Sequence, residues 1–257
     1  MELIDTHCHL DMADFDADRA DVLAACRAAG ISRIVIPAVT AAGWHNLLRL
    51  CREQDGLCAA LGMHPVFVAQ HQDADLAVLA QTLHTAQPVA VGEIGLDFYL
   101  PDLDRDRQCQ LFEAQLQIAR DADLPVLLHV RKAHDEVLAR LRRIKVKGGI
   151  AHAFNGSLQQ AGQYLELGFR LGFGGTLTYP RASHIRKLAA TLPLHALVLE
   201  TDAPDMVVAA HRGERNSPAY LTHVLDALAQ LRQLPAAEVA AQTTRNACEV
   251  LGLEQGG

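Results

Sequence analysis

The 257-residue sequence contains no apolar run that approaches the roughly 20 residues a helix needs to cross a bilayer. Its N-terminus also lacks a basic segment followed by an apolar stretch, which is the pattern of a secretory signal peptide. These two absences argue against a membrane-spanning or secreted protein. We therefore expect the mature chain to start where this sequence starts, to reside in the cytoplasm and to have no membrane partner.

Cysteine pairs and basic clusters are missing as well. The six cysteines include no C-x-x-C pair, and a chain of this length does not need disulfide bonds for stability, so we expect reduced thiols. The formal net charge of −7 and the lack of a basic run argue against a broad electrostatic surface for nucleic acids. A phosphate substrate held locally by metal ions and a few arginines is still compatible with this composition.

What the sequence does contain is a regular alternation of short apolar runs and longer amphipathic stretches. The apolar runs are typical of buried parallel strands, and they lie at 3–5, 33–39, 57–62, 88–95, 124–130, 148–154, 169–175 and 196–202. Helical patterns include 16–30, 104–124 and 157–168, and two more, 217–234 and 235–253, follow the last run. With a length near the typical size of about 250 residues, this predicts a single (β/α)8 TIM barrel, one domain over residues 1–257. A doubly wound open sheet is the alternative, because periodicity does not show closure.

The opening segment MELIDTHCHLDM places Asp5, His7 and His9 at two-residue steps where the first apolar run ends. Alternate side chains of a strand point to the same face, so we expect these three on one face and Cys8 packed on the other. A lone histidine is usually a hydrogen-bonded structural residue. Two imidazoles that converge on one face can bind a metal ion, provided that further ligands arrive from elsewhere in the chain.

Further ionisable residues stand at the ends of other apolar runs, where the active sites of such barrels lie. Glu93, His129, His152 and Asp202 each close or follow a run. Any one of them could be structural, but this explanation is hard to extend to five strand ends at once. Four histidines and two carboxylates exceed the three or four ligands usual for one catalytic zinc. They suit two ions about 3.5–4 Å apart, which can activate a water for displacement at phosphorus.

Six motifs resemble the TatD family of metal-dependent deoxyribonucleases in the amidohydrolase superfamily: DTHCHLD, GMHP, GEIGLDFY, PVLLHVR, HAFNGS and ETDAP, in this order. The similarity extends to RNSPAY (215–220), and ETDAPDM (200–206) looks most like the YjjV-type branch. The resemblance implies a metallo-dependent hydrolase barrel that acts on DNA phosphodiesters. It also implies these roles: His7 and His9 as ligands of a first metal, Glu93 as the bridging ligand, His129 and His152 as ligands of a second metal, and Asp202 as ligand and proton acceptor for the nucleophilic water.

The sequence departs from the family pattern at a few positions. Family members commonly have Cys and Ser where this chain has Ala153 and Asn155, and Tyr where it has Phe98. None of these is a ligand position. The loss of a hydroxyl at Phe98 weakens any argument that this residue contacts substrate.

Other polar residues are secondary candidates for substrate contacts. His64 in GMHP follows the third run and either touches a phosphate or caps the local structure. Arg131 lies two residues beyond His129, so the two side chains point to the same face of the strand if the strand extends that far. Arg212 and Arg215 lie in the loop after the eighth run. We take these arginines as candidate phosphate contacts, with solvated arginines as the alternative.

Two carboxylates are candidates for supporting the ligands. Glu200 shares the predicted face of Asp202 and can orient a ligand, whereas Asp5 either does the same or satisfies backbone donors. The histidines that match no ligand position, including His134 and His184, are interpreted as surface or structural residues.

Three functions fit these patterns. The favoured one is an exodeoxyribonuclease-type phosphodiesterase acting on DNA ends, the second is a hydrolase of a small amide, ester or phosphoester on the same barrel, and the third is a non-catalytic metal-binding protein. Superfamily members that bridge two metals often use a carboxylated lysine, so Glu93 in that role favours the nuclease. Asp202, the candidate base, argues against the third function. We expect two divalent ions per chain, drawn from Zn, Mn, Fe, Ni, Co or Mg, a DNA or other phosphodiester partner, and no obligate protein partner.

Overall fold

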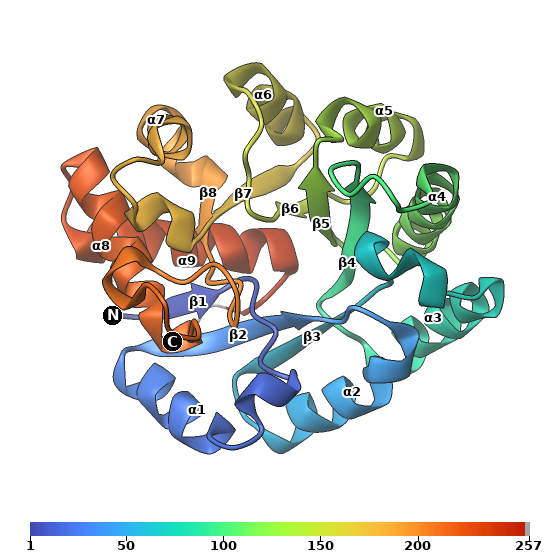
Figure 1. The fold of residues 1–257 in the computed structure, drawn as a ribbon, viewed down its shortest axis with the longest axis horizontal. Helices are drawn as coiled ribbons and strands as arrows, with labels where there is room; N and C mark the ends of the chain where they lie inside the picture. Colours follow the sequence, from blue (N-terminus) through green and yellow to red (C-terminus); the bar gives the residue numbers. More distant parts are fainter. Residues whose placement is uncertain (255–257) are drawn as a thin grey trace.

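The apolar runs form one parallel sheet whose strands follow one another in sequence order, β1 to β8 (Figure 1). A computed structural model describes residues 1–254. All eight predicted strands are confirmed, with these bounds: β1 Leu3–Asp5, β2 Ile31–Pro37, β3 Leu57–Leu61, β4 Ala90–Asp97, β5 Val126–Arg131, β6 Gly149–Ala151, β7 Phe169–Phe173 and β8 Leu197–Leu199.

Helices follow the strands and surround them, as Figure 1 shows for α1 to α7. Their bounds are α1 Arg19–Ala28, α2 Trp44–Glu53, α3 Asp73–Ala86, α4 Arg105–Asp121, α5 His134–Ile144, α6 Leu158–Glu166, α7 Ser183–Thr191, α8 Leu221–Arg232 and α9 Ala236–Leu251. Short 3₁₀ helices lie at η1 Ala13–Phe15, η2 Ala41–Gly43, η3 Pro65–Gln70, η4 Gly175–Thr178, η5 Leu194–Ala196, η6 Ala209–His211 and η7 Pro218–Tyr220. This arrangement is the predicted TIM barrel.

The barrel closes between β1 and β8 through hydrogen bonds just beyond the two strands. The Thr6 amide donates to the Leu199 carbonyl over 3.0 Å, and the Asp202 amide donates to the His7 carbonyl over 2.8 Å. We call this junction, formed by residues 5–9 and 199–203, the seam. Because the seam joins the first and last strands, the open-sheet alternative does not describe this chain.

The interior of the barrel is apolar at the N-terminal ends of the strands. Helix α9 packs there, so it covers the base of the barrel. The base cluster consists of Ile4, Val35, Ala60, Ala90, Leu127, Ile150 and Val198 from the strands with Ala247, Cys248 and Leu251 from α9. This cluster leaves only the opposite, C-terminal end of the barrel for polar side chains.

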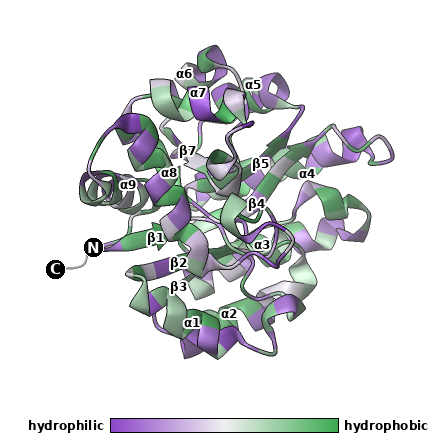
Figure 2. Ribbon diagram, turned by 60° about the vertical axis from the view of Figure 1, so that its left-hand side comes forward, coloured by the Kyte–Doolittle hydropathy of each residue, from purple (hydrophilic) through white to green (hydrophobic). Residues whose placement is uncertain are grey.

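A larger apolar cluster lies between the outer face of the strands and the surrounding helices. It includes Ile34 and Leu128 from strands and Leu47, Phe112 and Leu138 from helices. Figure 2 shows the consequence, because apolar strands lie inside helices whose colour alternates between green and purple. Within residues 1–254, no helix combines the length and apolarity that a membrane crossing requires.

Candidate metal centre

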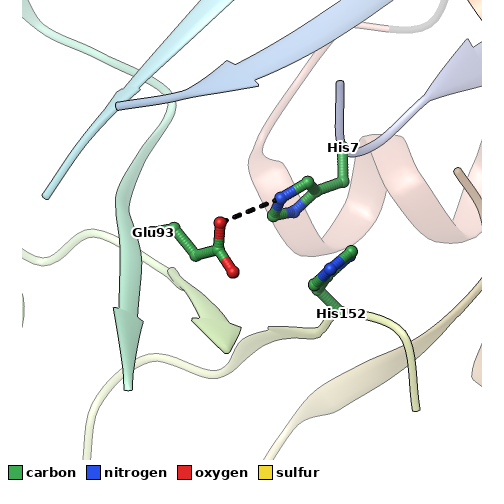
Figure 3. A group of neighbouring side chains, drawn as sticks. All are labelled: His7, Glu93 and His152. Carbon is green, nitrogen blue, oxygen red and sulfur yellow. Dashed lines mark hydrogen bonds and ion pairs between the residues drawn. The ribbon is translucent and has the colours of Figure 1, made fainter. Parts of the chain in front are cut away.

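The six predicted ligands meet at the C-terminal end of the barrel. Glu93 and His129 lie within β4 and β5, whereas the others follow β1, β6 and β8. Figure 3 shows His7, Glu93 and His152 converging from separate segments of the chain. The fold therefore brings together side chains that are far apart in sequence, at the strand ends where the sequence predicts them.

Glu93 lies at the centre of the group. Its Oε2 atom is 3.1 Å from His7 Nε2 and 3.6 Å from His9 Nε2. Its Oε1 atom is 3.0 Å from His129 Nδ1 and 3.3 Å from His64 Nε2. The two oxygens of one buried carboxylate thus face two different groups of imidazoles.

Asp202 completes the group from the seam. Its Oδ1 atom lies 3.8 Å from His7 Nε2 and 3.6 Å from His9 Nε2, and its Oδ2 atom lies 3.6 Å from His152 Nε2. In the part of the chain that the structure describes, ligand-type atoms lie within 4.8 Å of one another in three overlapping sets: His7, Glu93 and His152; His7, His9 and Asp202; His64, Glu93 and His129. The arrangement can hold metal ions.

Two carboxylates hold the rings of His129 and His152 from behind. Asp97 Oδ2 is 3.1 Å from His129 Nε2, and Glu200 Oε1 is 3.0 Å from His152 Nδ1. Asp97 is in hydrogen-bond contact with His129, whereas Glu200 makes an ion-pair contact with His152; in both cases the nitrogen nearer the centre, His129 Nδ1 or His152 Nε2, is left to bind a metal ion. The sequence pattern predicts a supporting role for Glu200 but not for Asp97, although Asp97 ends the same GEIGLD run that contains Glu93.

His64 approaches the centre as a hydrogen-bond donor. Its Nδ1 atom accepts the Val66 amide over 3.1 Å, so the neutral ring carries its proton on Nε2. That Nε2 atom lies 3.3 Å from Glu93 Oε1 and 3.2 Å from His129 Nδ1. His71 Nε2 lies 2.9 Å from the His64 carbonyl and braces the backbone. His64 therefore both caps its local turn and points a proton into the site.

Burial and mutual charge set the ionisation of the centre without metal. Burial raises the pKa of Glu93, but nearby His64 and His7 outweigh it and hold this pKa well below its usual range. Burial raises the pKa of Asp202 despite His152 and His7. Burial also lowers the pKa of His9 to about 3, so this ring is neutral and one of its nitrogens has a lone pair available to a metal ion.

The two carboxylate-backed histidines behave in the opposite way. Burial lowers the pKa of His129, but hydrogen bonds to Asp97 and Glu93 outweigh it and raise this pKa to about 9. Burial likewise opposes protonation of His152, but Glu200 and Asp202 raise its pKa to about 10. In the metal-free chain, these rings carry positive charge that a bound cation would replace.

The donor set fits divalent metal ions. Among residues 1–254, His7 Nδ1 and His9 Nδ1 are buried without a hydrogen-bond partner. These two rings therefore have coordinating capacity that protein groups do not use. Mixed imidazole and carboxylate ligation suits Zn, Mn, Fe, Ni and Co.

Asp5 does not share the face of His7 and His9, so this part of the strand prediction is wrong. The first strand ends at Asp5 and the chain bends at Thr6, which resets the alternation of side chains. The Asp5 carboxylate accepts the Thr201 amide over 3.0 Å and the Thr201 hydroxyl over 2.5 Å. It also accepts the His7 amide over 3.2 Å. Asp5 thus satisfies donors across the seam, the second of its two predicted roles.

A cleft of about 500 Å³ adjoins the centre. Its lining includes His129, Val130, Arg131, His152, Asn155, Phe154, Phe173, Asp202 and Met206. The Arg131 guanidinium carbon lies 3.7 Å from the centroid of the exposed Tyr99 ring. Arg131 thus belongs to the lining of the cleft, the position that a candidate phosphate contact requires.

The two loop arginines are not part of that lining. Arg215 pairs with Asp18 over 2.9 and 2.6 Å and lies 4.3 Å above the Phe15 ring. Arg212 is exposed after η6. The Arg215 pair ties the loop after β8 to the segment before α1, so its guanidinium is engaged structurally.

Comparisons with known proteins agree with this geometry. The family model described as TatD related DNase matches residues 4–252. The metal-dependent hydrolase YjjV of Escherichia coli K12 is 43% identical to this chain over 246 residues, which cover 95% of each chain. The crystal structure of E. coli YjjV superposes on this structure with a TM-score of 0.94 and 41% identity, over 98% of each chain. The 3'-5' ssDNA/RNA exonuclease TatD of Erwinia tasmaniensis is 32% identical over 98% of this chain and 100% of its own. The chain belongs to the TatD family of metal-dependent hydrolases.

Proposed function

We propose that this protein is a two-metal exonuclease that hydrolyses phosphodiester bonds at the 3′ ends of single-stranded DNA. The observation that carries the proposal is the position of Glu93, whose two oxygens face separate groups of imidazoles. The exonuclease name of the Erwinia relative supports the choice of substrate and direction. RNA ends are a second substrate that the same name suggests.

The ligands divide between two ions. His7, His9 and Asp202 would hold one, His129 and His152 would hold the other, and Glu93 would contact both. When bound, divalent ions offset the negative charge of the phosphodiester and lower the pKa of water.

The protein groups then have separate tasks in hydrolysis. Asp202 accepts the proton of the attacking water, and burial favours this because it raises the pKa of the carboxylate. His64 donates a hydrogen bond from Nε2–H to a phosphate oxygen and keeps this proton, since the Val66 amide fixes the tautomer. Arg131, at the cleft, contacts the next phosphate of the strand.

A second candidate is a hydrolase of a small amide, ester or phosphoester. The size of the cleft, about 500 Å³, favours it, because this volume lies in the range of pockets for small molecules. The lining of the cleft also includes the apolar side chains of Ile185 and Met206, which are not buried. The same centre would serve either substrate, so only activity separates the two functions.

The test is a substrate panel on purified protein that has been stripped and reloaded with each divalent metal. We expect 3′-terminal nucleotides to be released from single-stranded DNA and two metal equivalents to be bound per chain. Glu93→Ala, purified in the same way, controls for contaminating nucleases. Cleavage of small amides or esters without any release of nucleotides would replace the proposal with the second candidate.

A further inference from the structure

Asn155 is a polar side chain of the cleft that the reaction outlined above does not use. It follows β6 three residues after His152, lines the cleft and is exposed. Its amide Nδ2 donates to the Ala153 carbonyl over 3.1 Å. That contact identifies which end of the amide is nitrogen, so the oxygen Oδ1 is the atom that faces His134.

Two residues from neighbouring helices fix the orientation of this amide. His134, at the start of α5, places Nε2 3.2 Å from Asn155 Oδ1, and because Oδ1 only accepts, Nε2 carries the proton. His134 Nδ1 then accepts a proton from the buried Tyr164 hydroxyl of α6 over 3.2 Å. The chain Tyr164 to His134 to Asn155 therefore has one consistent direction of donation.

The fixed amide retains one donor for a ligand. Nδ2 carries two hydrogens, and among residues 1–254 only the contact with Ala153 uses one of them. The lining of the same cleft includes the partly exposed side chain of Ile185 and the exposed side chain of Met206. A lining with these two apolar side chains and one fixed N–H suits an uncharged group that carries a hydrogen-bond acceptor.

We propose that Asn155 is a specificity-determining residue that hydrogen-bonds the base of the 3′-terminal nucleotide, and that His134 and Tyr164 position it. This inference rests on the proposed function, because it assigns the cleft to the nucleotide that is released. Purine N3 and pyrimidine O2 offer an acceptor at similar positions of the base. One donor therefore favours the presence of a base without selecting among bases.

The central experiment compares two oligonucleotides, one ending in thymidine and one ending in an abasic residue. For Asn155→Ala we expect KM on the thymidine end to rise about three- to tenfold, the effect of one neutral hydrogen bond, with kcat nearly unchanged. On the abasic end, the variant and the parent should have the same KM. His184→Ala is the matched control, because the hydrogen bonds of His184 Nε2 within residues 1–254 go to the backbone carbonyls of Asn155 and Gly156, over 3.2 and 3.1 Å.

The positioning role has its own test. Tyr164→Phe and His134→Leu should raise KM on the thymidine end by part of the Asn155→Ala effect, and neither should add to it in a double mutant with Asn155→Ala. His134→Gln, which retains a side-chain donor, should restore most of the loss. Thermal midpoints identify variants that lose activity because they are unstable. If His134→Leu does not fold, Tyr164→Phe still tests the positioning role, because it keeps nearly the same volume in the buried ring.

The outcomes separate this inference from the proposed function. If the parent releases nucleotides from neither oligonucleotide, both fail. If the parent is active and Asn155→Ala changes KM equally on both ends, Asn155 only braces the loop that carries His152, and the inference fails alone. It also fails alone if Asn155→Ala changes neither substrate, or if His184→Ala has the same base-dependent effect.

Discussion

The two ends of the barrel are built from the same strands and yet do opposite things. At the base, Ala90 of β4 and Leu127 of β5 belong to the apolar cluster that also contains residues of α9. Only a few residues further along the same strands, Glu93 and His129 enter the metal centre. The base gains stability from apolar burial, whereas the centre buries ionisable groups at a cost in stability. Stability and chemistry are therefore separable by position along a strand.

The largest expected effect comes from removing the carboxylate between the two groups of imidazoles. Glu93→Ala should bring turnover below detection while the far-ultraviolet spectrum stays that of the parent, because two cations would then face each other without the shared anion. Kinetics at saturating metal, with metal content measured on the same sample, check this. Near-normal turnover would show that Glu93 does not bridge.

A smaller but still large effect is expected from Asp202→Asn. The amide keeps an oxygen at the seam but cannot accept a proton, so turnover should fall at least about a hundredfold. KM should change far less, because other groups hold the phosphate. Steady-state kinetics and the thermal midpoint are the measurements, and a stable, metal-replete variant with parental turnover would remove Asp202 from the mechanism.

The carboxylates behind the rings should matter less than the ligands. Asp97→Asn and Glu200→Gln each keep the shape but weaken the orientation and basicity of His129 or His152, so metal affinity or activity should fall about 10- to 100-fold. Metal titration of both variants beside the parent checks this. The matched variant Asp75→Asn, which alters a carboxylate that caps α3, should leave metal affinity unchanged. Parental affinity in both ring variants would mean that these carboxylates are not needed for binding.

Lowering the pH should weaken metal binding. The pKa values of His129 and His152 are raised to about 9 and about 10, so both rings are protonated at neutral pH in the metal-free chain. A metal must displace these protons, so apparent affinity should rise with pH toward those values by up to about tenfold per pH unit for each proton. Calorimetric titrations with metal in buffers of different ionisation enthalpy give the number of protons released for each metal ion bound. Affinity that does not depend on pH would contradict protonated rings.

The smallest effect on turnover should come from a substitution in the base cluster, at the end of the barrel opposite the metal centre. Leu127→Ala creates a cavity beneath α9 and should lower the free energy of unfolding by about 2–5 kcal/mol. Below its thermal midpoint, the variant should keep turnover within a few-fold and the parental metal content. Denaturant unfolding and kinetics on one preparation test the comparison of the two ends. If Leu127→Ala lost turnover as Glu93→Ala does, the ends would not be separable.

Much of this architecture could be predicted from sequence because it rests on periodicity. The spacing of apolar runs predicted the strands, and the residues at their C-terminal ends, such as Glu93 and His152, predicted the candidate ligands that the fold brings together. Other features depend on contacts that no spacing encodes. The tautomer of His64 depends on the Val66 amide. The separation of Asp5 from the face of His7 and His9 depends on the bend at Thr6. The role of Arg215 depends on its partner Asp18, which lies 197 residues away in sequence.

The seam has a consequence for when the protein becomes active. Asp5 bonds to Thr201 across 196 residues of sequence, and the Asp202 amide bonds to the carbonyl of His7. During synthesis, the N-terminal histidines leave the ribosome long before their partners exist. A nascent chain that ends before Thr201 has neither a closed barrel nor the Asp202 carboxylate. We therefore expect hydrolytic activity to appear only when the two distant segments join, and a chain interrupted before Thr201 to be inactive.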